Sequence, residues 1–368
     1  MTLSPPSPPL RASTATASAA ATASAPLTSA LRTGLAAAAR RGRRPLDALG
    51  DSLDDLLGRP VDPRDRVLVL LEIADLQTGP QHPGARFAHH PAVARLQWEL
   101  ESSWLDELTE TAVPADLPAL GDPDDPDAAP AVVAALRALA ARDRLPTVYR
   151  WVAREASWSE VVAFLALEGG PDAGFDDLVA ACQVGLTGRP KLELATNYWD
   201  EMGNGDLAAV HTVLHEDLVE AIAMPRLPRD AQPLAGLERV ALGALMATNH
   251  WLQPEMLGAL GLIELQAGPR CRLVLQAFER LGAPAGARPF YEVHAEVDPR
   301  HGRDWMDNAI VPVLSEHPEW GPRIVRGAWW RSLLNRRFFE VAESLVLEPS
   351  PAPSAALANG ADAAAAAA

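Results

Sequence analysis

Cysteine is almost absent from this chain of 368 residues, which contains only Cys182 and Cys271. Two cysteines are too few for a disulfide-stapled scaffold or a cysteine-ligated cluster, so we expect both to be small buried residues. Such low usage is typical of a reducing compartment, and the simplest expectation is a cytoplasmic protein. Long apolar runs are missing as well: none approaches the roughly 18 residues that a membrane-spanning helix needs.

Positive charge is also scarce, because the formal net charge is −16. A general nucleic-acid binder would need a basic surface to neutralise phosphates, so that class is excluded. The chain also lacks a glycine-rich nucleotide loop that follows a strand, so we expect no site of its own for NAD or flavin. The expected partner is a small-molecule substrate, and any electrons would come from an external donor.

Both ends of the chain have low complexity. Residues 1–45 consist largely of Ala, Ser, Thr and Pro, with six arginines and no acidic residue. This composition predicts a disordered leader. An organellar transit peptide would look similar, but clear amphipathic spacing is missing, and a start codon assigned too early would also explain the segment. Residues 349–368 are predicted to be a disordered tail.

Between these ends, the pattern divides the chain into two folded parts. Residues 46–130 are predicted to form a helical extension that ends in an acidic, proline-rich connector. The connector, residues 113–130, holds five prolines and five aspartates. We place the boundary near Pro130, so that residues 131–348 form the main domain. The extension could cap this domain, cover a pocket or mediate a homodimer.

The main domain is predicted to be an all-α bundle. Apolar residues recur at spacings of three and four in segments such as SWSEVVAFLALEGG and LERVALGALMATNHWL, and strand-like alternation is missing. Ser157 and Glu160 have the spacing of a capping box that opens a helix. Bundles commonly hold metals between facing helices, so the carboxylates and histidines of this part are the candidates for a site.

The strongest candidate lies in residues 290–301, which read FYEVHAEVDPRH. His294, Asp298 and His301 follow one another at spacings of four and three residues, so in a helix they share one face. Two imidazoles and a carboxylate suit iron or manganese. A solvated surface or a hydrogen-bonded core would give the same pattern. Pro299 lies inside the segment, so we expect the helix to start, kink or loosen there.

Other candidate ligands lie on other expected helices. Glu201 and His211 could face one site, or the intervening MGNGD could be a turn between two ordinary helices. Glu264 has mostly apolar neighbours, so its burial needs compensation by a metal or by an arginine such as Arg270. Glu168, at the end of its expected helix, could be a ligand or an exposed terminus.

His211 and His215 are four residues apart and could form a zinc pair. The glutamate that usually follows the first histidine of such a pair is replaced by Thr212, and a third protein ligand is not evident. We therefore expect His215 to pack near the site or to support a ligand.

Taken together, these positions resemble the haem-oxygenase-like diiron oxidases, which are also described as iron-containing redox enzymes. The resemblance rests on Glu201 and His211 across a DEMGNGD segment, on Glu264 thirty residues before His294, and on the histidine and aspartate triplet. It covers roughly residues 145–345. The implied fold is a haem-oxygenase-like helical bundle of about seven core helices, here with an N-terminal helical extension.

The resemblance implies two non-haem Fe(2+) ions per chain, with dioxygen as co-substrate. The ligands carried over by position are Glu201, His211, Glu264, His294, Asp298 and His301, with Glu168 as a variable seventh. The implied activity is that of an oxidoreductase that oxidises a small molecule by N-oxygenation, oxidative carbon–carbon cleavage or decarboxylation. The resemblance also suggests that residues 290–301 become ordered when metal and substrate bind.

Two other classes stay open. A cofactor-free binding or scaffold protein would carry the same polar residues incidentally, and replacing His294 and Asp298 together would then change little. A haem-dependent or mononuclear metalloenzyme could use the same bundle. Haem would need an axial histidine on an early helix, and Glu168 stands where that contact is expected.

Overall fold

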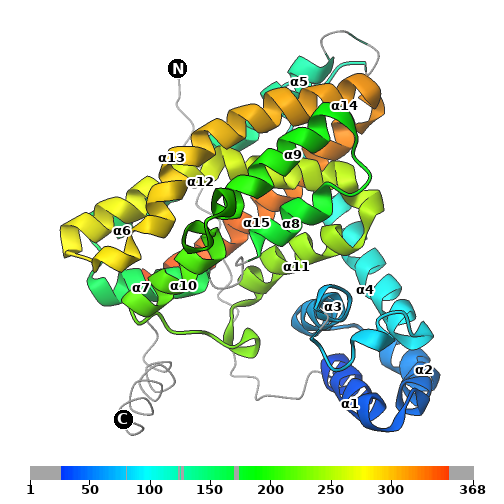
Figure 1. Ribbon diagram of the computed structural model, residues 1–368. Helices are drawn as coiled ribbons and strands as arrows, with labels where there is room; N and C mark the ends of the chain where they lie inside the picture. Colours follow the sequence, from blue (N-terminus) through cyan, green and yellow to red (C-terminus); the bar gives the residue numbers. More distant parts are fainter. Residues whose placement is uncertain (1–25, 80, 123–124, 126–127, 170–173, 348–368) are drawn as a thin grey trace, which may run out of the picture.

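The computed structural model describes residues 26–79, 81–122, 125, 128–169 and 174–347 (Figure 1). The α-helices of these residues are α1 (Pro26–Arg41), α2 (Arg44–Leu57), α3 (Pro63–Thr78), α4 (Pro91–Glu110), α5 (Ala128–Arg142), α6 (Thr147–Arg154), α7 (Trp158–Glu168), α8 (Phe175–Cys182), α9 (Gly188–Glu201), α10 (His211–Ala221), α11 (Leu234–Thr248), α12 (Gln253–Leu281), α13 (Pro289–Asp304), α14 (Val311–Glu316) and α15 (Gly321–Leu347). No strand occurs among them, so the all-α prediction is confirmed. None of these helices combines the length and apolar character that crossing a bilayer requires.

The long helix α12 is the centre of the bundle and packs against α13 and α15 (Figure 1). Its contact with α15 is a close approach of two backbones. A Cβ atom at Gly258 would overlap the carbonyl oxygen of Ile324, and a Cβ atom at Gly327 would overlap the backbone of Glu255. Only glycine allows this crossing. The packing of α12 against α15 therefore depends on Gly258 and Gly327.

The same crossing contains a buried carboxylate. Glu255 of α12 is fully buried and accepts hydrogen bonds from Arg323 at 2.8 and 2.9 Å and a further one from Arg326, both on α15. A buried charge is tolerated when it is paired and hydrogen-bonded in this way. The ion pairs fix the register of the two helices beside the glycine contact.

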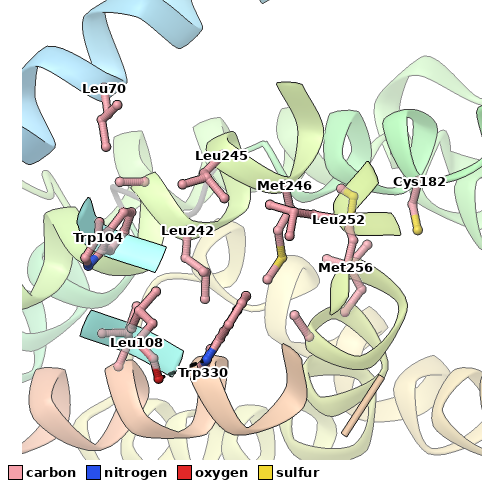
Figure 2. Close-up of a cluster of buried hydrophobic side chains, with 14 of the residues drawn as sticks. Leu70, Trp104, Leu108, Cys182, Leu242, Leu245, Met246, Leu252, Met256 and Trp330 are labelled. Carbon is pink, nitrogen blue, oxygen red and sulfur yellow. Dashed lines mark hydrogen bonds between the residues drawn. The ribbon is translucent and has the colours of Figure 1, made fainter. Parts of the chain in front are cut away.

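Helix α3 packs against α11, and α1 and α4 pack on α3, while α2 packs on α1 and α4 (Figure 1). Figure 2 shows side chains of α3, α4, α11, α12 and α15 in one apolar cluster. Within it, the indole nitrogen of Trp330 donates to the carbonyl oxygen of Leu108 at 3.1 Å. The extension thus covers one side of the bundle and shares its core.

Residues 26–45 correct one expectation, because they form α1 and the start of α2 and not a disordered leader. Leu27, Leu31 and Leu35 are buried, at a spacing of four residues that places them on one face of α1. Alanines and other small residues around these leucines obscure the amphipathic pattern in the sequence. Residues 1–25 and the predicted tail at 349–368 lie outside the described residues.

A distant side chain explains why α1 is stable despite its composition. The buried carboxylate of Asp65, in α3, accepts hydrogen bonds from the backbone nitrogens of Leu27 and Thr28, both at 2.9 Å. It also accepts one from the Thr28 hydroxyl at 2.6 Å. Helix N-termini carry unsatisfied N–H groups that a carboxylate can cap. Here the cap comes from 37 residues away, so local composition could not indicate it.

Candidate metal centre

Six acidic and imidazole side chains from four helices meet inside the bundle, in two groups of three. We call them the Glu201 group (Glu201, His211 and His294) and the Glu264 group (Glu264, Asp298 and His301). Within each group, one nitrogen or oxygen atom of every residue lies within 4.8 Å of the others. Helix α13 contributes to both groups, since His294 and Asp298 are four residues apart on it.

The Glu201 group forms across a tight turn. Glu201 is the last residue of α9 and His211 the first of α10, so the alternative of a turn between two helices is correct. Gly203, Asn204 and Gly205 all have positive φ angles, of 61°, 54° and 89°. This left-handed run reverses the chain direction at little cost only with glycine or asparagine. As a result, Oε2 of Glu201 lies 2.7 Å from Nδ1 of His211.

His294 completes this group with a defined tautomer. Its Nδ1 donates to the carbonyl oxygen of Phe290 at 2.6 Å. Since a carbonyl can only accept, the proton is on Nδ1 and the lone pair on Nε2 is available for a metal. Burial lowers the pKa of His294 to about 4, so the ring is neutral at pH 7. Its ring centroid is 4.5 Å from that of His211.

In the Glu264 group, carboxylates surround an imidazole. Nε2 of His301 donates to Asp200 at 2.9 Å, which turns Nδ1 toward Glu264 at 3.6 Å. Burial by itself lowers the pKa of His301, but interactions with the nearby carboxylates of Glu264, Asp200 and Asp298 outweigh it and raise the pKa to about 9. Burial and the neighbouring charge of Glu264 raise the pKa of Asp298 well above its usual value. The group therefore favours a positive charge at its centre.

The buried donor atoms of both groups fit a cation. Oδ2 of Asp298 and Nδ1 of His301 have no hydrogen-bond partner among the described residues. Nδ1 of His211 is close to Glu201 but is not oriented for a hydrogen bond to it. Buried polar atoms are normally satisfied, so three such atoms in two adjacent groups need an explanation. Nitrogen and carboxylate oxygen donors suit iron or manganese. One metal ion in each group would bind Nδ1 of His211 in the Glu201 group and the other two atoms in the Glu264 group.

A cavity of about 430 Å³ opens onto both groups. Glu201, His211 and His294 line it from one group, and Glu264 and Asp298 from the other. Its other walls include Tyr149, Phe175, Leu178, Ile263, Phe290 and Tyr291. This volume and this largely apolar lining are typical of a site for a small molecule.

The comparison with known protein families supports an iron enzyme over a cofactor-free protein. The model of the family described as "Iron-containing redox enzyme" matches residues 162–336, a range that holds all six residues of the two groups. Residues 162–336 belong to the iron-containing redox enzyme family. A search of the curated proteins gives no match to this chain.

Membership of the iron-containing redox enzymes indicates an oxidoreductase with a haem-oxygenase-like helical bundle. It agrees with the donor set, because the groups offer only imidazole and carboxylate ligands. The two cysteines are both buried, and burial raises the pKa of each thiol, so neither is suited to bind metal as a thiolate.

Two further candidates line the cavity outside both groups. Glu168, at the end of α7, accepts a hydrogen bond from the hydroxyl of Tyr149 at 2.9 Å. His215 is buried against Phe290, and burial lowers its pKa. Arg270, the alternative partner for Glu264, instead donates to Gln266 and to backbone oxygens.

Sequence reasoning missed two residues of α9 that position ligands. Nδ2 of Asn197 donates to Oε1 of Glu264 at 2.7 Å, and Asp200 holds His301 as described above. Ligand histidines in metalloproteins commonly donate their other N–H to a carboxylate in this way. The signal was present in the sequence, since Asn197 and Glu201 are four residues apart on one helix and Asp200 lies between them.

Replacing Asp200 by asparagine is expected to weaken iron binding by about 10- to 100-fold without removing a ligand, because His301 loses the anion that orients it. Ferrous affinity under nitrogen is the measurement. Glu292→Gln, an exposed change on α13, is the control and should bind iron as the wild type does. Equal affinities in all three proteins would show that Asp200 does not support the site.

Replacing Gly203 by alanine is expected to cost about 2 kcal/mol or more, since it adds backbone strain and a clash. The new Cβ would lie 2.5 Å from the carbonyl carbon of Ala209. Gly282→Ala is the matched control, because Gly282 has a φ of 68° and open space around its Cβ position. Urea unfolding should show a larger loss in the free energy of unfolding for Gly203→Ala than for Gly282→Ala. The Gly203→Ala protein should also bind less iron. Equal losses of stability in the two variants would contradict the role of the close turn.

Pro299 does not start a new helix, since α13 runs through it from Pro289 to Asp304. The proline has no N–H for the carbonyl oxygen of Ala295, and Arg272 of α12 donates to that oxygen at 2.7 Å instead. A π-helical turn follows at Trp305–Ile310. Such turns often mark functional sites.

Hydrogen exchange in residues 290–301 is expected to slow when ferrous iron is added, because bound metal would tie α13 to α9, α10 and α12. The amides of α2 serve as the internal reference and should exchange at an unchanged rate. Exchange through residues 290–301 that does not respond to iron would contradict ordering of this helix by the metal.

Proposed function

We propose that this protein is a non-haem diiron oxidase or oxygenase that uses dioxygen to oxidise a small molecule. One ferrous ion would bind to the Glu201 group and the other to the Glu264 group. The observation that supports this most strongly is the adjacency of the two groups on one cavity, linked by His294 and Asp298 on the same face of α13. A single mononuclear site would need only one of them.

The three carboxylates of the two groups would offset most of the charge of a pair of divalent cations. Glu201, Glu264 and Asp298 supply carboxylates that offset positive charge and can bridge metals, while the histidines supply neutral donors. Glu168, on the cavity wall, is proposed as the seventh ligand. To reach a metal it would have to exchange its hydrogen bond with Tyr149.

When bound, two ferrous ions supply electrons that reduce dioxygen for oxidation of an organic substrate. The protein contributes position and environment. Phe290 packs against His294 with ring centroids 4.5 Å apart and keeps this imidazole on the cavity wall. The aromatic and aliphatic part of the lining would limit the contact of the reacting molecule with bulk water. N-oxygenation, oxidative carbon–carbon cleavage and decarboxylation are the proposed reaction types, and an external donor would restore the ferrous state.

The test is to load the full chain with ferrous iron under nitrogen and then to admit oxygen. We expect oxygen consumption and a transient visible absorbance change that both require iron. The same protein loaded with zinc is the control, since zinc has no redox chemistry. Iron-loaded protein that consumes no more oxygen than the zinc form would overturn the proposal.

A further inference from the structure

Three arginines from three helices border the same cavity as the two metal-ligand groups. They are Arg239 of α11, Arg270 of α12 and Arg331 of α15, with only 4%, 8% and 5% of their surfaces exposed. Arginine is seldom buried to this degree. Burial is the main cause that lowers the pKa of Arg270, and the positive charges of Arg239 and Arg331 lower it further, while Tyr149 and Glu168 act in the opposite direction.

Arg270 is held in place by neutral groups. Its Nη2 donates to the carbonyl oxygen of Asp143 at 2.7 Å and to Oε1 of Gln266 at 2.8 Å, and its Nε donates to the carbonyl oxygen of Arg144 at 3.3 Å. No carboxylate of the described residues forms an ion pair with it. The guanidinium is therefore fixed and buried while its charge is not neutralised by direct contact, an arrangement that suits an anionic ligand.

The other two arginines are also fixed by the fold. The Arg239 guanidinium lies over the ring of Phe338 at 4.3 Å, and Arg331 donates to the backbone oxygen of Arg239 at 3.3 Å. Rigid placement of this kind reduces the entropy lost when a ligand binds. The planar guanidinium matches the two oxygens of a carboxylate.

The distance along α12 defines how a ligand would lie. Arg270 follows Glu264 by six residues, which is about 9 Å along the helix axis. The same cavity is lined by apolar and aromatic side chains, among them Ile263, Phe290 and Tyr291. A molecule with its anionic end at Arg270 would extend its apolar body toward the metal ligands.

We propose that the cavity binds a small organic carboxylate with an aromatic or aliphatic body, whose carboxylate contacts Arg270 beside Arg239 and Arg331. This inference rests on the proposed function, since it names the substrate class of that site. A carboxylate is favoured over a phosphate ester because the cavity is also lined by acidic side chains that belong to neither group, including Asp176 and Glu216, and these repel a dianion more strongly than a monoanion.

The test uses the iron-loaded chain under nitrogen and four probes of similar shape: 3-phenylpropanoate, 3-phenylpropan-1-ol, 3-phenylpropylamine and 2-phenylethyl phosphate. Calorimetry measures their affinities. We expect 3-phenylpropanoate to bind at least about 10-fold more tightly than each of the others, since a charge-assisted bond to a buried arginine separates them. This comparison needs no variant protein.

Variants then identify the group that holds the carboxylate. Arg270→Gln keeps donors for the backbone oxygens but removes the charge, and we expect it to weaken 3-phenylpropanoate binding by about 10- to 100-fold. Arg331→Gln should weaken it in the same direction. Arg95→Gln, which removes an arginine paired with Asp54 on the surface of the extension, is the control and should leave affinity unchanged.

Iron content is measured on the same samples, so the diiron proposal and the carboxylate inference can each be overturned independently. Protein that binds iron but prefers the alcohol, the amine or the phosphate ester overturns the carboxylate inference alone. Unchanged affinity in Arg270→Gln also overturns it, because the carboxylate would then be held by the metal. Protein that binds 3-phenylpropanoate through Arg270 but takes up no iron leaves the inference standing and overturns the diiron proposal.

Discussion

Replacing His294 by alanine is expected to lower the iron content from about two ferrous ions per chain to about one, and to abolish iron-dependent oxygen consumption. His294 offers Nε2 to the Glu201 group, and its removal leaves that group with one imidazole and one carboxylate. The Glu264 group keeps all of its donors. Asp298→Ala should have the converse effect, since it removes a ligand from the Glu264 group alone. Iron analysis after anaerobic loading and desalting is the measurement.

His215→Ala is the matched control for these two variants. His215 is also a buried histidine on the cavity wall, four residues after His211, but it belongs to neither group. It should retain both ions. If His294→Ala and His215→Ala bind the same amount of iron as the wild type, His294 is not a ligand. If one ligand variant loses both ions, the groups bind metal only as a unit.

Replacing Gly327 by alanine is expected to destabilise the protein by about 3 kcal/mol or more, which is a large part of a typical folding free energy. The added Cβ would overlap backbone atoms of Glu255, which cannot move aside as a flexible side chain can. Helices α12 and α15 would have to separate, and the buried ion pairs of Glu255 would weaken with them. Because α12 carries Glu264, iron binding should fall together with stability.

Gly50→Ala is the control for this prediction. Gly50 lies inside α2, where an added Cβ would be 3.4 Å from the Cβ of Ala92, an ordinary contact. There alanine should stabilise the helix by about 0.5–1 kcal/mol. Chemical denaturation of the three proteins gives the comparison. A Gly327→Ala protein as stable as the wild type would contradict the tight crossing of α12 and α15.

The sequence predicted those parts of the molecule that depend on local patterns. Apolar spacing predicted the helices, and the capping box of Ser157 and Glu160 is present at the start of α7. Spacing along one helix also placed His294, Asp298 and His301 on a shared face. Glu292 and Glu296, each two residues from His294, are exposed on the other face of α13.

The remaining features depend on contacts between distant segments. The cap of Asp65 on α1 and the oxygen of Ala295 bound by Arg272 join residues that sequence spacing does not relate. The support of His301 by Asp200 crosses between α9 and α13. The three cavity arginines come from three helices, and Arg270 was considered only as a counter-ion for Glu264.

The central claim is that two irons share one site, and Mössbauer spectroscopy with parallel EPR on chain loaded with iron-57 tests it most directly. After oxidation, we expect about two irons per chain in a magnetically coupled pair without an EPR signal, because bridging carboxylates would link the two groups. An EPR signal of isolated high-spin ferric ions that accounts for all the bound iron would contradict the diiron site.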